Sequence, residues 1–389
     1  MAYNQAMWIW QTSDWPNYQY DTTRFKDRID LFRLKSERLL GRIEALPDNS
    51  QTDALVDLML SEAITTSAIE GENLDRDSVR SSLLSLIGVE SESVSHDNKA
   101  VGAATLMVDV RKNWNQPLTD ELLGQWQSCV IADSPMSLIM RGAYRNSVEP
   151  MQIVSGAMGR MRIHYEAPPS EQVPEEMRRF LDWYNATSPL TGDNSLPGPI
   201  RAGIAHVWFE NIHPFDDGNG RVGRAIADHA LSQSLGYPTM ACLATAIEAN
   251  KKEYYAQLET IGRGQLELSG WLDFFTNEIS RAQGIAKEEV DFVLAKTRYY
   301  DRFGDQLNER QKKVIARIYA EGRKGFEGGL STKNYETIAK CPTRTASRDL
   351  ADLMEKGALV RHGGGRSTRY ELAIVESSTL LTFTESYSF

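Results

Sequence analysis

One short segment of the sequence gathers the residue types that phosphate chemistry requires. It runs from His213 to Arg224 and reads His-Pro-Phe-Asp-Asp-Gly-Asn-Gly-Arg-Val-Gly-Arg. A histidine has an unperturbed pKa of about 6.5, so it can take a proton from a hydroxyl group at neutral pH. Asp217 offers a hard carboxylate oxygen, which Mg2+ accepts together with phosphate oxygens. We therefore expect His213 to be a general base and Asp217 to be a metal ligand.

The glycine-rich turn after the aspartate is suited to binding phosphate. Residues 218–220 (Gly-Asn-Gly) lead into a run with helical spacing, and a helix N-terminus offers free backbone N–H groups and a favourable dipole to an anion. Arg221 and Arg224 project from one face of that helix and can pair with phosphate oxygens. Each residue alone would fit an ordinary capped, charged helix, but the complete set favours a phosphate site.

The segment resembles the signature of the Fic family, HxFx(D/E)GNGRxxR, at every specified position. This resemblance implies a protein adenylyltransferase, which moves AMP from ATP to a Ser, Thr or Tyr hydroxyl of a target protein or of itself, uses Mg2+ and releases diphosphate. His213 would be the base. The residues implied to bind ATP are Asp217, Gly218, Asn219, Gly220, Arg221, Val222, Gly223, Arg224, Ile163, His164, Tyr254 and Tyr255. Many relatives carry an asparagine shortly after the tyrosine pair, whereas this chain continues Glu-Thr-Ile-Gly-Arg-Gly-Gln.

A second motif lies far upstream, at the end of a helix predicted over 52–69. Residues 66–71 read Thr-Ser-Ala-Ile-Glu-Gly and match the inhibitory motif of the same family, (S/T)xxxE(G/N). The match implies that Glu70 reaches Arg224, takes the group that the γ-phosphate needs and inhibits the enzyme. An ordinary surface glutamate is the alternative, although a carboxylate at a helix C-terminus is unfavourable. In some relatives this glutamate also supports removal of AMP from the target, so we include de-AMPylation as a hypothesis.

The elements that must position these residues are mainly helices. Apolar spacing predicts helices over 23–46, 52–69, 99–114, 118–131, 173–186, 196–210, 219–235, 239–259 and 269–284. Residues 151–165 alternate in polarity and predict a β-hairpin with Gly156 to Gly159 at its tip. This hairpin resembles the flap of the family, which would present the target by backbone pairing.

The composition changes near residue 300. Helical segments over 308–321, 331–340 and 343–356 are followed by short strands over 358–361 and 367–372, which is the order of a winged helix. Residues 308–373 hold 14 Lys and Arg but only 8 Asp and Glu. The basic residues that could contact DNA are Arg344 and Arg348 on the candidate recognition helix and Arg361, Arg366 and Arg369 on the wing. A protein-interaction or dimerisation module is the alternative.

We therefore expect a mainly α fold with three parts. Residues 1–98 would form an N-terminal arm and helices that include the inhibitory helix, 99–288 a Fic catalytic core with its hairpin flap, and 289–389 a winged-helix domain. Residues 89–98 read as a polar linker. The tryptophans at 8, 10 and 15 are expected to pack the arm onto the core.

Bulk properties exclude several classes of protein. The 389 residues carry a net charge of -10, so nucleic-acid binding would need a local basic patch. The three cysteines lie far apart without CxxC spacing, which argues against a disulfide framework or a zinc site. The N-terminal residues do not read as a signal peptide, and no run of about 18 apolar residues predicts a membrane span. We expect a cytoplasmic protein, and the family likeness favours a homodimer.

Two alternatives to this function stay open. The glycine-rich turn would recognise phosphates and not a base, so another diphosphate-containing donor could replace ATP. A nucleotide-sensing, DNA-binding transcriptional regulator is the alternative from another class of protein. The presence of His213 favours the enzyme, because a sensor would not need the base.

Overall fold

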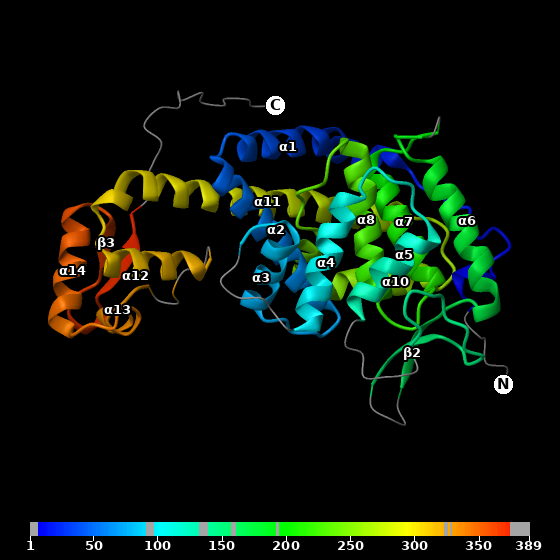
Figure 1. Ribbon diagram of the computed structural model, residues 1–389. Helices are drawn as coiled ribbons and strands as arrows, with labels where there is room; N and C mark the ends of the chain where they lie inside the picture. Colours follow the sequence, from blue (N-terminus) through cyan, green and yellow to red (C-terminus); the bar gives the residue numbers. More distant parts are fainter. Residues whose placement is uncertain are drawn as a thin grey trace. The chain divides into compact units, whose positions relative to one another are not determined.

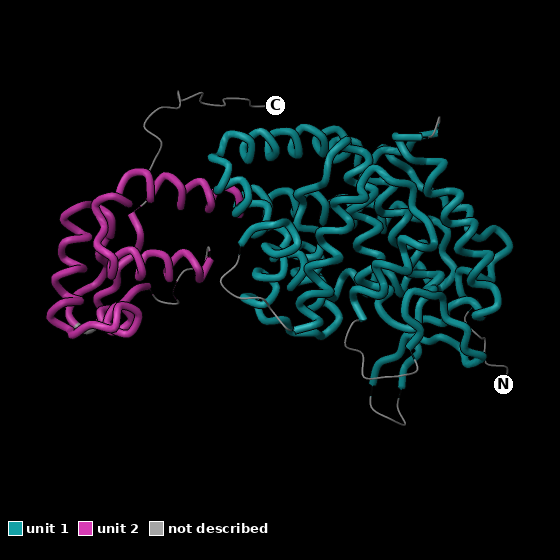
Figure 2. Tube along the Cα trace, viewed as in Figure 1, with its two compact units in different colours: residues 1–288 teal, residues 289–389 magenta. Residues whose placement is uncertain are grey.

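The computed structural model describes residues 7–90, 97–131, 139–156, 161–191, 194–322, 326 and 329–373. The chain divides into two compact units, residues 1–288 and 289–389 (Figure 2). Helices make up most of both units (Figure 1), and the predicted mainly α fold is confirmed. Most of the predicted polar linker, residues 91–96, lies outside the described residues.

The first unit consists of helices and one β-hairpin. Its helices are α1 (Lys26–Glu44), α2 (Asp48–Ile69), α3 (Arg76–Leu86), α4 (Asn98–Lys112), α5 (Asp120–Val130), α6 (Val173–Ala186), α7 (Gly198–Ile212), α8 (Asn219–Leu235), α9 (Leu243–Ala249), α10 (Lys251–Gly262) and α11 (Ser269–Phe303), the last of which ends in the second unit. The helices α6 and α8 have the predicted bounds, since both begin and end at clear signals such as Gly236 after α8.

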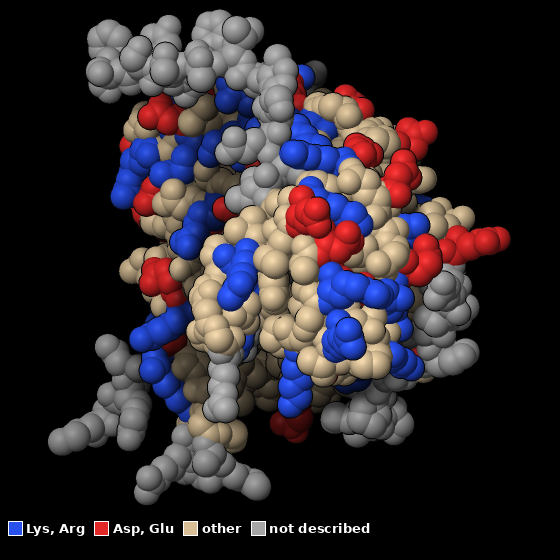
Figure 3. Space-filling model, turned by 90° about the vertical axis from the view of Figure 1, so that its left-hand side faces the viewer, with Lys and Arg blue, Asp and Glu red and all other residues tan. Residues whose placement is uncertain are grey.

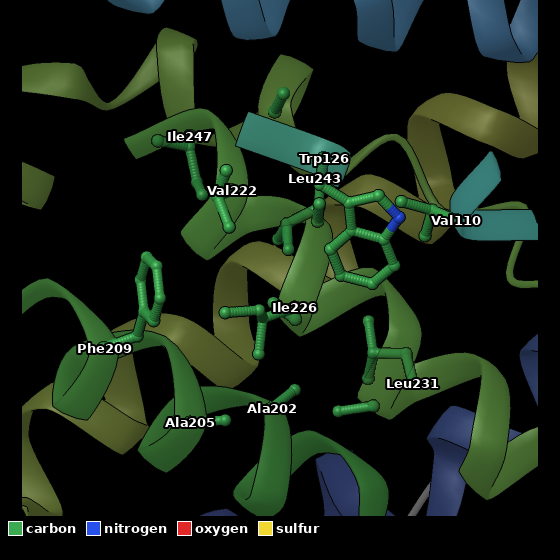
Figure 4. Packing of buried hydrophobic residues seen from close by; sticks show 14 of the residues in the cluster. Val110, Trp126, Ala202, Ala205, Phe209, Val222, Ile226, Leu231, Leu243 and Ile247 are labelled. Atoms are coloured by element: carbon green, nitrogen blue, oxygen red, sulfur yellow. The ribbon is translucent and has the colours of Figure 1, made fainter. Parts of the chain in front are cut away.

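The central pair of helices is α7 and α8, which bracket the segment that carries the predicted chemistry. Every residue of α7 and nearly every residue of α8 is buried, as expected for helices that are covered on all sides. Figure 4 shows Phe209 of α7 and Val222 and Ile226 of α8 packed among side chains such as Trp126 of α5. The loop between these helices is therefore held at both ends by the core.

Several predicted helix bounds were wrong. The segment predicted as one helix over 239–259 is two helices, α9 and α10, separated at Asn250. The helix predicted over 269–284 continues to Phe303, and α3 was not predicted. The helix predicted from residue 52 instead begins at Asp48, directly after Pro47, and an acidic residue in the first turn favours this start.

The predicted hairpin is present as β1 (Gln152–Ser155) and β2 (Arg162–Glu166), which pair antiparallel. Residues 157–160, which include most of the predicted tip, lie outside the described residues. The N-terminal arm packs against the unit as expected. The indole of Trp10 donates to the Glu166 carbonyl at 2.8 Å, and buried Trp15 stacks edge-on against Trp208.

The second unit has its own hydrophobic core. Besides the end of α11, it contains α12 (Glu309–Ala320), α13 (Thr332–Ala339), α14 (Thr343–Glu355) and the antiparallel strands β3 (Leu359–His362) and β4 (Arg369–Leu372). Three helices and a two-stranded hairpin follow the order from which we predicted a winged helix, and that assignment stays a prediction. Within the described residues, no helix is long and apolar enough to cross a membrane.

Candidate functional site

The N-terminus of α8 leaves backbone donors free for an anion. Its N-terminal cap is Gly218, which has a φ of 90° and supplies no side chain to accept the first N–H groups. A Cβ atom on Gly218 would lie 2.7 Å from Val130, so both its backbone angle and its surroundings require glycine. A helix start without a side-chain cap is suited to bind phosphate.

His213 occupies the C-terminal cap of α7 in a left-handed conformation, with φ 51° and ψ 59°. Buried Arg145 stabilises this turn, because its guanidinium donates to the His213 carbonyl at 2.8 Å and to the Pro168 carbonyl at 2.6 Å. Phe215 is fully buried and anchors the loop in the core, as expected. Since side chains rarely adopt this backbone conformation, His213 is placed by the packing around it.

The imidazole of His213 is only 16 % exposed, and it stays neutral over the physiological range. Burial lowers its pKa to about 4, and the nearby Arg145 cation contributes in the same direction. Its Nδ1 atom is buried and has no hydrogen-bonding partner among the described residues. A neutral imidazole can accept a proton, which is the state that a general base requires.

Asn219 and Asp217 have different environments. The buried Asn219 side chain donates to the Phe215 carbonyl at 2.8 Å and accepts from the Phe215 N–H at 2.9 Å, so it holds the loop, and only its backbone is left for a phosphate. The Asp217 side chain is 48 % exposed; its carboxylate accepts from the Gly218 N–H at 2.6 Å and lies 3.6 Å from Arg221. The Asp217 carboxylate is thus open to solvent just before the N-terminus of α8.

Glu70 meets Arg224 at this helix start. The Arg224 guanidinium donates to Glu70 Oε1 at 2.8 Å, to the Thr66 hydroxyl at 2.8 Å and to the Thr66 carbonyl at 2.9 Å. Burial alone would raise the pKa of Glu70, but the Arg224 cation outweighs it and lowers that pKa. A Cβ atom on Gly220 would collide with Glu70 Oε1, so the carboxylate lies against the first turn of α8, where an anion would bind.

Arg221 forms a second ion pair that the sequence did not lead us to predict. Its guanidinium donates to Glu72 Oε2 at 2.6 Å, and the other oxygen of Glu72 lies 3.1 Å from Lys99. Glu72 follows Gly71, which has a φ of 83° and turns the chain after α2. The signal in the sequence was a second glutamate directly after the inhibitory motif, but its partner depends on this turn.

Two buried donors of these arginines have no partner among the described residues: Arg224 Nη1 and Arg221 Nε. Buried donors of this kind cost free energy unless they are satisfied, so they fit a group with several acceptor oxygens, such as a phosphate chain. No cluster of three or more metal-ligating side chains occurs within the described part of the chain. One exposed carboxylate still suits Mg2+, which binds mainly through water and phosphate oxygens.

The remaining predicted ATP contacts are divided between core and surface. Val222 is fully buried in the core, and Gly223 lies against His206, so neither offers a side chain to a ligand. Tyr254 is buried and its hydroxyl lies 2.8 Å from His206 Nε2, whereas Tyr255 is 43 % exposed and its hydroxyl lies 3.4 Å from the Ile69 carbonyl at the end of α2.

The flap residues Ile163 and His164 lie on β2, where Ile163 is exposed. His164 is not free, because its Nδ1 lies 2.8 Å from the Glu259 carboxylate of α10 and its Nε2 lies 2.5 Å from the Ser155 hydroxyl of β1. Arg162 also pairs with Glu259, at 2.5 Å. These contacts fix the hairpin against α10 and give His164 a structural partner at each nitrogen.

Comparison with known protein families matches two parts of the chain. A model described as the Fic/DOC family matches residues 117–231, and a domain of unknown function (DUF4172) matches residues 8–89. The first match contains the whole segment from His213 to Arg224, and the second contains Glu70 and Glu72.

Individual relatives are more distant. Protein adenylyltransferase fic-1 of Caenorhabditis elegans is 27% identical over 267 residues, which cover 67% of this chain and 47% of that protein. Protein adenylyltransferase Fic of Culex quinquefasciatus is 25% identical over 250 residues, which cover 63% of this chain and 44% of that protein. This chain thus spans less than half of either relative.

A solved structure supports the fold. The crystal structure of a Fic domain containing signaling protein from Bacteroides thetaiotaomicron aligns with a TM-score of 0.50 at 19% sequence identity, over 68% of this chain and 97% of that chain. At this identity the likeness concerns the fold alone.

Proposed function

Because this chain contains a Fic domain, we propose that it is a protein adenylyltransferase that transfers AMP from ATP to a Ser, Thr or Tyr hydroxyl of a target protein, or of itself, and that Glu70 inhibits it. The relatives named above as protein adenylyltransferases support the activity. The homodimer and the cytoplasmic location stay predictions.

The observation that carries this proposal is the position of the Glu70 carboxylate. It lies against the uncapped start of α8 and pairs with Arg224 at 2.8 Å, so an anion of the chain itself lies where we propose that a phosphate binds. Arg221 and Arg224 each keep a buried donor without a partner in the described structure, which a phosphate chain would satisfy. The neutral imidazole of His213 lies at the other end of the same loop.

The proposed reaction is a displacement at the α-phosphorus of ATP. His213 Nε2 takes the proton of the target hydroxyl, whose oxygen attacks that phosphorus; the bond to the bridging oxygen breaks and diphosphate leaves. Arg221, Arg224 and the backbone N–H groups of α8 stabilise the charge that develops on the phosphate oxygens. Asp217 would hold Mg2+, which supplies further charge neutralisation for the phosphates.

Inhibition would follow from the same contacts. With Glu70 on Arg224, the γ-phosphate loses its partner and the α-phosphate is misplaced relative to the hydroxyl. A displacement of about 1 Å can cost on the order of 100-fold in rate. Support of AMP removal by Glu70 is a further hypothesis, and a Glu70→Gly chain that still removed AMP from a modified target would refute it.

Incorporation of label from α-labelled ATP with Mg2+ tests the proposal. We expect the Glu70→Gly chain to label itself or a target at least 10-fold faster than wild type, and the Glu70→Gly/His213→Ala chain to be inactive, because removal of the base costs about 10²–10⁴-fold. Glu44→Gly is a matched control, since it removes an exposed glutamate from the end of another helix, α1. It should behave as wild type.

Other outcomes would change the assignment. Reaction with γ-labelled ATP or with another nucleotide donor, but not with α-labelled ATP, would support the assignment of the site. It would show that the group transferred from ATP is not AMP. Binding of nucleotide without any transfer would favour the nucleotide-sensing regulator.

A second candidate function, contact with DNA, rests on α14. Its inner face is buried in the core of the second unit through Ala346, Leu350 and Leu353, whereas Arg344 and Arg348 are exposed and have no ion pair among the described residues. Figure 3 looks onto the side on which α14 lies in Figure 1, and Lys and Arg side chains are exposed at several places on it, with Asp and Glu side chains among them. Fluorescence anisotropy with a labelled DNA duplex tests this candidate.

A further inference from the structure

The carboxyl group of Glu210 lies directly behind the proposed base. Glu210 is in the last turn of α7, three residues before His213, and its Oε2 atom lies 4.0 Å from His213 Nδ1. Its side chain is only 10 % exposed. Its Oε1 atom has no hydrogen-bonding partner among the described residues, and neither has His213 Nδ1, although the backbone carbonyl of Glu210 favours the protonated form of that imidazole. Neighbouring buried side chains thus each keep an unsatisfied polar atom, Glu210 Oε1 and His213 Nδ1, while Oε2 is the carboxyl oxygen that lies 4.0 Å from Nδ1.

The packing around this carboxyl shows that its position is specific. A Cβ atom on Gly223 would lie 2.6 Å from Glu210 Oε1 and 3.2 Å from the His206 ring, so only glycine at 223 admits both side chains. The Gly223 that the signature leaves unspecified therefore makes room for Glu210. The carboxyl is not neutralised by Arg224 through any ion pair within the described residues, because that guanidinium bonds to Glu70 and Thr66.

We propose that Glu210 is a positioning residue for His213, its carboxylate accepting the Nδ1 proton so that Nε2 is free to take the proton of the target hydroxyl. This inference rests on the proposed function for its kinetic consequence. A carboxylate that accepts from the far nitrogen of a catalytic histidine fixes both the tautomer and the orientation of the ring, and it stabilises the imidazolium that forms. A protonated carboxyl would instead donate to Nδ1 and leave the proton on Nε2, where it blocks the base.

The charge state of Glu210 links this arrangement to Glu70. Burial raises the pKa of Glu210 to about 8, and the Glu70 carboxylate raises it further while Arg224 lowers it. At neutral pH Glu210 is therefore mostly protonated while Glu70 is in place, and it ionises as the pH rises through about 8. Removal of the Glu70 charge shifts this ionisation to lower pH. The titratable groups around Glu210 are His206, His213, Arg224, Glu70, Tyr254 and Tyr255.

The pH dependence of labelling from α-labelled ATP tests the inference in the Glu70→Gly background. We expect kcat of the parent to rise with pH as Glu210 ionises, and the Glu70→Gly/Glu210→Gln chain to lose that rise. Above pH 8 the variant should be roughly 10-fold or more slower, a part of the about 10²–10⁴-fold that a general base supplies, with KM for ATP unchanged. A uniform loss of kcat with an unchanged pH profile would show a purely structural role and overturn the inference.

A second measurement separates this inference from the proposed function. The ¹⁵N chemical shifts of the His213 ring report its tautomer without any turnover, and His213→Ala assigns the signals. We expect Glu210→Gln to change the tautomer balance of His213 and to abolish its dependence on pH near 8. Identical shifts in both chains would reject the role of Glu210 even if labelling succeeds, whereas absence of labelling with altered shifts would reject only the transferase.

The matched control is Glu278→Gln on α11. Glu278 is also a buried glutamate with an unsatisfied oxygen, Oε2, among the described residues, but its other oxygen accepts from Asn250. This variant should leave both the pH profile of labelling and the His213 shifts as in the parent. An equal effect of the two variants would show that loss of any buried carboxyl disturbs the site.

Discussion

At the scale of single residues, the two arginines of α8 are paired with two glutamates from the turn after α2. Glu70 pairs with Arg224 at 2.8 Å and Glu72 pairs with Arg221 at 2.6 Å. Removal of Glu70 alone therefore leaves Arg221 paired with Glu72. Both pairs lie at the start of α8, so they would hinder the nucleotide independently of each other.

Glu72→Gln in the Glu70→Gly chain is expected to lower KM for ATP by roughly 10-fold, since a hydrogen bond to a charged group contributes about 1.5–3 kcal/mol. Titration of ATP in the labelling assay measures it. Glu253→Gln, which changes an exposed glutamate of α10, should leave KM as it was. An unchanged KM in the Glu72 variant would mean that Arg221 is not engaged by the nucleotide.

Residues within the contiguous motif were predictable, because their spacing alone fixes their neighbourhood. His213, Gly218 and Arg224 lie on one loop and the first two turns of the helix that follows it. Glu72 and Glu210 were not predicted, since their contacts depend on the turn at Gly71 and on which face of α7 is turned to Gly223. The sequence identifies a glutamate, but it does not determine which buried arginine or histidine that side chain will contact in the fold.

At the scale of elements, the position of α2 decides whether Glu70 and Thr66 reach α8. The buried Glu62 of α2 holds the helix against α9, because its carboxylate accepts from the Ala244 N–H at 2.7 Å and from the Thr245 N–H at 3.2 Å. These are N–H groups in the first turn of α9, which has no side-chain cap of its own. A glutamate from one helix thus caps another.

Glu62→Ala is expected to lower the free energy of unfolding by about 2 kcal/mol or more, because each buried donor left without a partner costs about 1–3 kcal/mol. The same change should raise the self-labelling of an otherwise wild-type chain, since α2 is then held less firmly. Denaturant unfolding and the labelling assay measure the two effects. Glu37→Ala removes only an exposed pair with Arg33, so it should lower the free energy of unfolding far less than Glu62→Ala does.

The helices with clear end signals were predictable and the others were not. The bounds of α6 and α8 agree with their apolar spacing. The helix α3 was not predicted, because its four serines and three charged residues leave few apolar residues to reveal a helical pattern; its buried face includes Val79 and Leu83. The division between α9 and α10 at Asn250 carries no proline or glycine signal. Tertiary packing overrides weak local preference in such segments.

At the scale of the whole molecule, charge is distributed unequally along the chain. The net charge is -10, but residues 308–373 carry 14 Lys and Arg against 8 Asp and Glu. Residues 308–373 are therefore the segment whose charge favours attraction to nucleic acid. If the same surface binds a protein instead, its binding should not depend on the phosphate charges of a nucleic acid.

The Arg344→Ala/Arg348→Ala chain is expected to bind a DNA duplex roughly 10-fold or more weakly than wild type. Two lost phosphate contacts should also reduce the slope of log K against log salt by about 2, since each contact contributes about 0.9. The Arg33→Ala/Arg178→Ala chain has the same charge change at exposed arginines of the first unit and should bind as wild type. Equal binding by all three chains, or none by wild type, would favour a protein partner.

The three hydrogen bonds that Arg224 makes to Thr66 and Glu70 also bear on nucleotide selectivity. ADP and ATP differ only in the γ-phosphate, which is the group that Arg224 would bind. While Arg224 is hydrogen-bonded to Thr66 and Glu70, a third phosphate adds no affinity. The resting protein should therefore bind ADP as tightly as ATP. The ATP/ADP ratio of the cell would then become a signal to this protein only once Glu70 has moved away.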